Sequence, residues 1–71
     1  MYFEIKYQNL NNYNIDKMYF KSASKQEAEN DFYMYNGEHY DILNIKRISK
    51  KELIKRGDLW IIKEERELTK L

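Results

Sequence analysis

Residues 23–28 read Ala-Ser-Lys-Gln-Glu-Ala, and this short stretch decides where the first helix of the fold begins. A serine followed three residues later by glutamate is a capping box, whose two side chains accept hydrogen bonds from backbone N–H groups at a helix start. The flanking alanines have the spacing of a hydrophobic staple. The same pattern recurs in residues 48–53, Ile-Ser-Lys-Lys-Glu-Leu. We therefore expect two helices, the first capped by Ser24 and the second by Ser49.

The chain before the first box alternates between apolar and polar residues, which is typical of half-buried strands. Residues 2–8 and 15–22 both show this alternation. Residues 9–14 between them are rich in asparagine, which tolerates a left-handed backbone and makes local turns. The pattern predicts a β-hairpin. The side chains expected to face its core are Phe3, Ile5, Tyr7, Met18 and Phe20.

The first helix is expected to end at Asn36-Gly37, because glycine suits the left-handed position that follows a helix. Inside this helix, Ala28, Phe32 and Tyr35 fall at i, i+4 and i+7 and form a narrow apolar stripe. We expect this stripe to lie across the apolar face of the hairpin.

Residues 40–48 are rich in β-branched side chains and predict a third strand, whose two mixed faces suggest a central position in the sheet. The second helix should end at Gly57, and residues 59–62 predict a fourth strand. Residues 63–71 could fray or form a terminal helix. The expected fold is a small single α+β domain, residues 1–71, ordered ββαβ and then short helix and strand, with the first helix packed on one face of the sheet. The stretch between the third and fourth strands is short for a parallel crossover.

Composition limits the classes of protein that the chain can represent. It has 71 residues and no cysteine, so neither a disulfide nor a thiolate zinc site is expected. Seven Tyr, three Phe and one Trp supply the large buried areas that such a short chain needs. No apolar run approaches the length of a membrane span, and the first four residues are unlike a signal peptide. We expect a cytoplasmic protein that is not inserted in a membrane.

Charge is unevenly distributed along the chain. Residues 22–45 contain one lysine against five acidic residues, whereas residues 46–57 contain six basic residues against one glutamate. Such segregation can steer a partner into one orientation. The preference for Lys, Asn, Ile and Tyr, whose codons are AT-rich, suggests an AT-rich bacterium or one of its phages or mobile elements.

Catalytic and metal-binding patterns are lacking in the sequence. His39 is the only histidine, and Asp41 beside it would give two ligands where a zinc site needs three or four. Two of the candidate nucleophiles, Ser24 and Ser49, are explained by capping. Gly37 and Gly57 belong to no glycine-rich phosphate loop. We therefore expect no enzyme, no cofactor and no metal.

The leading hypothesis is a small non-enzymatic binding protein with a protein partner. We expect an accessory protein of a phage or mobile element that binds a host target and inhibits or modulates it, as an anti-defence inhibitor does. Exposed aromatics beside an acidic helix would form the contact, since Tyr and Trp anchor many interfaces. The expected protein-binding residues are Glu27, Glu29, Asp31, Tyr33, Tyr13 and Trp60.

Two alternatives stay open. The outer face of the hairpin interleaves tyrosine with lysine, as in sheets that stack bases and neutralise phosphates, and the basic segment could extend it. The residues of this nucleic-acid alternative are Tyr2, Lys6, Lys17, Tyr19, Lys21, Arg47, Lys50 and Lys51. The other alternative is a structural homodimer joined through a sheet edge.

Overall fold

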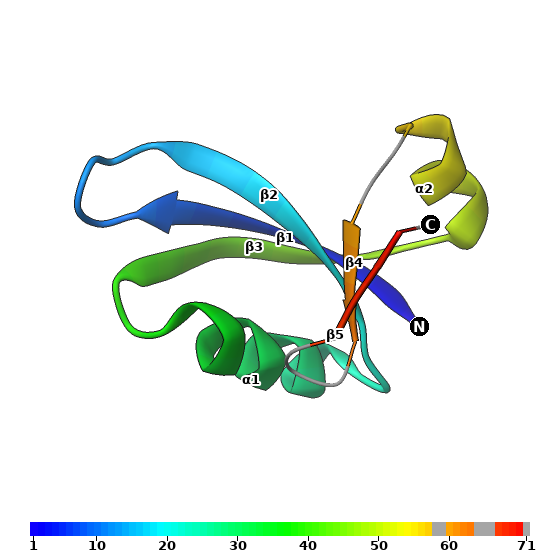
Figure 1. The fold of residues 1–71 in the computed structure, drawn as a ribbon, viewed down its shortest axis with the longest axis horizontal. Coiled ribbons are helices and arrows are strands. Elements are labelled where there is room, and N and C mark those ends of the chain that lie inside the picture. The colour runs from blue at the N-terminus through cyan, green and yellow to red at the C-terminus, as the bar shows by residue number, and fades with distance from the viewer. Residues whose placement is uncertain (58–59, 64–66, 71) are drawn as a thin grey trace.

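The computed structural model describes residues 1–57, 60–63 and 67–70, and it describes side chains for residues 1–57, 61 and 62. It is an α+β fold with one mixed sheet and two helices (Figure 1). The elements in chain order are β1 (Tyr2–Asn9), β2 (Ile15–Lys21), α1 (Lys25–Asn36), β3 (Tyr40–Ile48), α2 (Lys50–Lys55), β4 (Trp60–Lys63) and β5 (Glu67–Lys70).

Both helices begin where the capping boxes place them. The backbone N–H of Glu27 donates to the Ser24 hydroxyl, and that of Glu52 donates to the Ser49 hydroxyl, each over 3.2 Å. In the first helix the Glu27 carboxylate also reaches back, but it accepts the N–H of Ala23, one residue before the cap, over 3.1 Å. The hydrophobic staple of the second helix is confirmed, because Ile48 before the cap and Leu53 four residues after it belong to one buried cluster. In the first helix, Ala28 is buried in the core but Ala23 is exposed and does not belong to that cluster.

The sheet has the strand order β3-β1-β2-β4-β5. β1 pairs antiparallel with both β2 and β3, β2 pairs parallel with β4, and β4 pairs antiparallel with β5. Two expectations were therefore wrong. β3 lies at an edge of the sheet, and its mixed faces reflect that edge and a bulge between its contacts with Lys6 and Tyr7. The end of the chain forms strand β5, where a frayed tail or a helix was expected.

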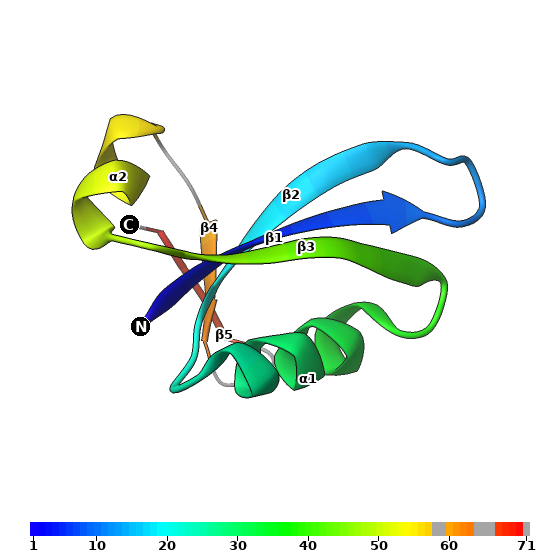
Figure 2. The same cartoon turned by 180° about the vertical axis from the view of Figure 1, so that it is seen from behind.

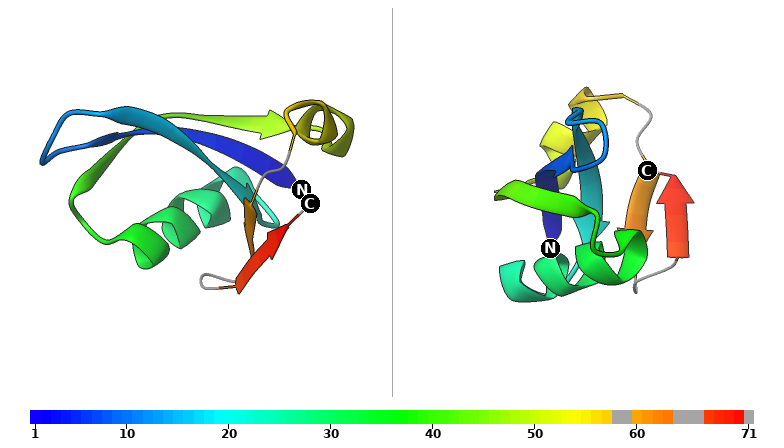
Figure 3. Two further views of the ribbon diagram at one scale, coloured as in Figure 1. Left: turned by 45° about the horizontal axis from the view of Figure 1, so that its top comes forward. Right: turned by 90° about the vertical axis from the view of Figure 1, so that its left-hand side faces the viewer.

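The short connection between β3 and β4 is also explained. The two strands run in the same direction but are separated by β1 and β2, and α2 lies in the connection between them (Figure 2). α2 packs on the face of the sheet that α1 does not cover, so the crossover passes over that face. The two helices thus lie on opposite faces (Figure 3).

The face under α1, called the α1 face, holds the larger core. The predicted stripe is confirmed: Ala28 and Phe32 are fully buried and Tyr35 packs beside them. Phe32 contacts the rings of Tyr7 and Phe20, with centroids 5.3 Å and 6.1 Å away. The hairpin residues that the alternation assigned to the core all belong to this cluster or pack against it.

The opposite face, called the α2 face, holds a smaller second core. Leu53 of α2 is fully buried against Tyr19, Ile48 and Ile61, and Tyr2 packs at the margin. α2 covers this face only near the end where β1 begins, and the hairpin projects beyond it (Figure 1). The β1–β2 turn therefore lies at the end of the sheet away from α2 and beside the α1–β3 connection, to which it is joined by a hydrogen bond from Leu10 N–H to His39 O over 3.0 Å.

Candidate binding surfaces

The turn of the hairpin, residues 9–15, is named here the hairpin tip. Its backbone is held by Asn side chains: Asn9 Oδ1 accepts the N–H of Asn11 over 2.8 Å, and Asn12 Oδ1 accepts the N–H of Asn14 over 2.9 Å. Backbone hydrogen bonds of 2.7 Å and 2.9 Å close the turn onto Asn9. These bonds give the asparagine-rich segment one defined conformation.

Tyr13 has an unusual backbone in this turn. Its φ is +62°, and no other non-glycine residue among those described has a positive φ. The Tyr13 carbonyl accepts the Gln8 side-chain N–H over 3.1 Å, and this bond holds the peptide group between Tyr13 and Asn14. The side chain is 72% exposed. Leu10 and Ile15 are exposed apolar neighbours in the same tip. The turn therefore presents a tyrosine, with two aliphatic side chains nearby, on a braced backbone.

A buried carboxylate organises the α2 face. Glu4 is 9% exposed in its side chain, and Arg56 Nη1 lies 3.0 Å from its Oε2. The Tyr19 hydroxyl donates to the same oxygen over 3.1 Å, and Lys17 Nζ is 3.8 Å from Oε1. Burial raises the pKa of Tyr19 above its ordinary value of 10.0, and the hydrogen bond to Glu4 raises it further. Arg56 thus reaches from the end of α2 to the middle of the sheet.

This arrangement corrects the expectation of an exposed tyrosine and lysine face. Tyr19 is buried beneath α2, and Tyr2 is half-buried against the same cluster. Neither ring stands open as a stacking platform for bases. Lys6, Lys17 and Lys21 are exposed as expected. Lys21 Nζ lies 5.9 Å from the centroid of the Tyr2 ring.

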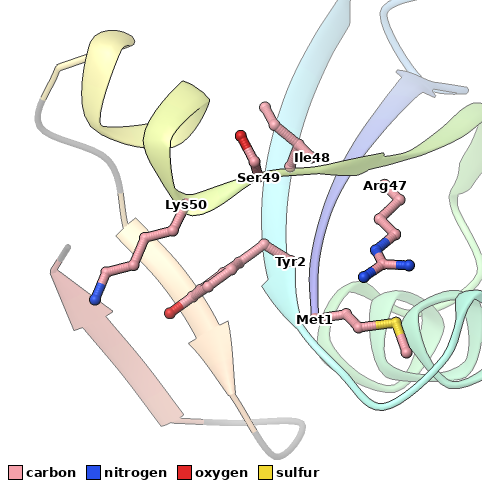
Figure 4. A pocket seen from close by; sticks show the side chains of 6 residues that line it. All are labelled: Met1, Tyr2, Arg47, Ile48, Ser49 and Lys50. Atoms are coloured by element: carbon pink, nitrogen blue, oxygen red, sulfur yellow. The ribbon is translucent and has the colours of Figure 1, made fainter.

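The strand register places Arg47, one of the residues predicted for the nucleic-acid alternative, on the opposite face from the hairpin lysines Lys6 and Lys17. Lys46 pairs with Glu4 and therefore shares the α2 face, whereas Arg47 pairs with Phe3 and belongs to the α1 face. Lys50 and Lys51 are exposed at the start of α2. A shallow pocket forms where β1, β3 and α2 meet (Figure 4). Its lining residues are Met1, Tyr2, Arg47, Ile48, Ser49 and Lys50.

The acidic helix is less available for recognition than its sequence suggested. The Glu27 carboxylate accepts the N–H of Ala23 over 3.1 Å, and the Asp31 carboxylate accepts the Ser22 hydroxyl over 2.8 Å. Glu29 is half-buried, and Tyr33 is exposed beside Phe32, with 5.3 Å between ring centroids. The prediction for Trp60 concerns a side chain outside the described residues.

Metal-binding geometry does not arise in the part of the chain that the structure describes. No group of three or more His, Cys, Asp or Glu side chains gathers there. His39 lies exposed in the α1–β3 connection. None of the described helices is long and apolar enough to span a membrane.

Several residues of these surfaces were missed by sequence reasoning. Arg56 stands far from Glu4 in the chain, and only the packing of α2 brings the two together. Leu10 and Ile15 could have been noticed as possible contact residues, since both are apolar residues within or beside a polar turn. The positive φ of Tyr13 had no signal, because four neighbouring asparagines adopt that conformation more readily.

Comparisons of the chain with models of protein families, with curated proteins and with solved structures found no match.

Proposed function

We propose that this chain is a non-enzymatic binding protein that docks on a protein target through the hairpin tip and so inhibits or modulates it. The observation that carries the proposal is Tyr13, an exposed aromatic held at φ +62°. In the setting that the composition suggests, the chain acts in the cytoplasm as an accessory protein of a phage or mobile element.

The backbone of Tyr13 supports a functional role. A non-glycine residue in the left-handed region costs about 1–3 kcal/mol, and such residues cluster at binding sites. Asn12 and Asn11, one and two positions earlier, would take the same backbone at lower cost. A tyrosine at this position is better explained by what its side chain does in a complex than by the stability of the turn.

The surroundings of Tyr13 suit a protein interface. Tyrosine is among the residues that most often dominate binding energy. Leu10 and Ile15 would extend the apolar contact. Because the turn is braced by hydrogen bonds, little conformational entropy is lost when it docks. By contrast, Glu27 and Asp31 already serve intramolecular hydrogen bonds, so we assign the primary contact to the tip rather than to the acidic helix.

The test compares Tyr13→Asn with the parent chain in affinity capture from a bacterial lysate treated with nuclease and washed at raised salt. Ile54→Gln is the matched control, since Ile54 is a 61% exposed apolar residue on α2, at the other end of the molecule. We expect the parent and Ile54→Gln to retain the same protein and Tyr13→Asn to lose it. Urea unfolding should show Tyr13→Asn to be as stable as the parent or more stable, because asparagine relieves the left-handed backbone.

Unchanged capture by Tyr13→Asn would contradict the proposal. A marked loss of stability in Tyr13→Asn would also contradict it, because the tyrosine would then serve the fold.

A further inference from the structure

The exposed part of the α2 face carries three lysines on three neighbouring strands, named here the lysine patch: Lys6, Lys17 and Lys46. Lys6 of β1 pairs directly with Lys17 of β2. Lys46 of β3 pairs with Glu4 and is the diagonal neighbour of Lys6. Directly opposed side chains have Cβ atoms about 5 Å apart, and diagonal ones about 7–8 Å. All three lysines are exposed.

The patch has an excess of positive charge. Like charges placed directly opposite each other destabilise a sheet, so the pair of Lys6 and Lys17 has an energetic cost. Two carboxylates lie on this face. Glu4 has its shorter contacts with Arg56 and Tyr19, at 3.0 Å and 3.1 Å, while Lys17 is 3.8 Å away. Asp41 pairs with Gln8 and is exposed. Because the Glu4 charge is largely matched by Arg56, three lysines face the single charge of Asp41, and the surface keeps a net positive charge.

The two faces of the sheet differ in charge, and this difference would orient an anionic partner. The acidic residues of α1, Glu27, Glu29 and Asp31, lie on the helix that covers the opposite face of the sheet. A polyanion is therefore attracted by the α2 face and repelled by the α1 side, so the charges select one orientation. Lys21 shares the α2 face, since it pairs with Tyr2, and the lysines of α2 are also exposed.

From this geometry we infer that the lysine patch binds the phosphate backbone of a nucleic-acid duplex. Lysine is depleted at the centres of protein interfaces but common in contacts to phosphates. Asn44, which pairs with Lys6 on the same face, adds a polar group that can bond phosphate oxygens. Tyr19 is buried and Tyr2 is half-buried, so neither of these tyrosines offers the stacking platform that single strands require. A duplex offers a dense array of phosphates without needing such a platform. The inference does not rest on Tyr13.

The test is fluorescence anisotropy with a short labelled DNA duplex, repeated at several salt concentrations. Each phosphate contact contributes about −0.9 to the slope of log affinity against log salt, so we expect a slope of roughly −2 to −3 for the parent chain. The variant K6Q/K17Q should bind about tenfold or more weakly at low salt, and its slope should be less steep by about 1 for each lysine removed.

K25Q/R47Q is the control of equal charge, with Lys25 on α1 and Arg47 on the α1 face, and it should bind the duplex like the parent. Urea unfolding provides a second readout. K6Q/K17Q should be as stable as the parent or more stable, because it removes the opposed like charges, so lost binding would not mean lost fold.

Equal weakening by the control variant would overturn the inference, since binding would then follow net charge alone. Affinity that is absent at low salt, or that does not change with salt, would also overturn it. Tighter binding of polyglutamate or of a single strand than of the duplex would assign the patch to an acidic protein or to single-stranded nucleic acid instead.

Discussion

The two helices are held on the two faces of the sheet by different interactions. On the α1 face, a helix of 12 residues packs aromatic and aliphatic side chains against the hairpin, and Phe32 alone meets four other rings. On the α2 face, a helix of six residues contributes one fully buried side chain, Leu53, together with an ion pair from Arg56 to Glu4. A long apolar stripe needs no charge to fix its position, whereas a single buried leucine leaves the short helix dependent on a polar contact.

The largest expected effect tests whether the α1 face dominates stability. Phe32→Ala should cost about 3–5 kcal/mol, and Leu53→Ala about 2–3 kcal/mol, because the phenylalanine leaves the larger cavity and loses its ring contacts. A core of this size supplies only about 3–5 kcal/mol in total, so Phe32→Ala should be largely unfolded in water. Circular dichroism during urea unfolding measures both changes.

Met34→Ala is the control on α1, where the side chain is exposed and the change should stay within about 0.5 kcal/mol. A larger loss from Leu53→Ala than from Phe32→Ala would reverse the ranking of the two faces.

A smaller effect tests the ion pair that fixes α2. Arg56→Met should cost about 1–2 kcal/mol, because it removes a charged hydrogen bond from a buried carboxylate, and the cost is moderated by the partial exposure of Arg56. Arg47→Met, on the α1 face, is the matched control and should change the free energy of unfolding by no more than about 0.5 kcal/mol.

The double variant Glu4→Gln with Arg56→Met gives a sharper result. Since the buried charge is gone, the double variant should lose less stability than the two single variants together. Additive losses would show that Arg56 stabilises the fold through packing rather than through Glu4.

The smallest expected effect is the pH dependence of stability, to which one buried or half-buried tyrosine on each face contributes. Burial raises the pKa of Tyr7 on the α1 face and of Tyr19 on the α2 face above 10.0, in Tyr7 with a contribution from Asp16 and in Tyr19 from Glu4. Because the folded chain holds both phenol protons more tightly than the unfolded chain, this stabilisation is complete below pH 10 and is lost as pH rises through the folded pKa values. The free energy of unfolding should therefore fall in alkaline solution.

Glu4→Gln distinguishes the two tyrosines. It should lower the pKa of Tyr19 and leave that of Tyr7 unchanged, as measured from the ring carbon resonances by NMR. Equal shifts in both tyrosines would mean that the faces are not electrostatically separate.

Much of the fold follows from local sequence, and the exceptions have physical causes. Ser24 and Ser49 mark their helices because capping involves only neighbouring residues, and alternation in residues 2–8 assigns the faces of β1 because strand periodicity is local. The edge position of β3 depends on which strands pair, and its mixed faces, which fit an edge strand, also fit the central strand that was expected. The final strand likewise depends on β4 as its partner.

The candidate surfaces were less predictable for the same reason. Lysines on the hairpin were identified correctly as exposed, but the burial of Tyr19 depends on a helix more than thirty positions later in the chain. The assignment of Lys46 rather than Arg47 to that face depends on the register with β1. Tyr13 was chosen for its place in a turn, and its left-handed backbone emerged only from the hydrogen bonds that brace the turn.

The parallel pairing of β2 with β4 has a consequence for synthesis on the ribosome. β2 ends at Lys21 and its partner ends at Lys63, so one edge of β2 stays unpaired until the last third of the chain has been made. At translation rates of about 5–20 residues per second, this interval lasts on the order of two to eight seconds. During that time the nascent hairpin offers bare backbone N–H and C=O groups to any neighbouring strand. A transcript cut short before β4 would make that exposure permanent, and its product would be prone to aggregate.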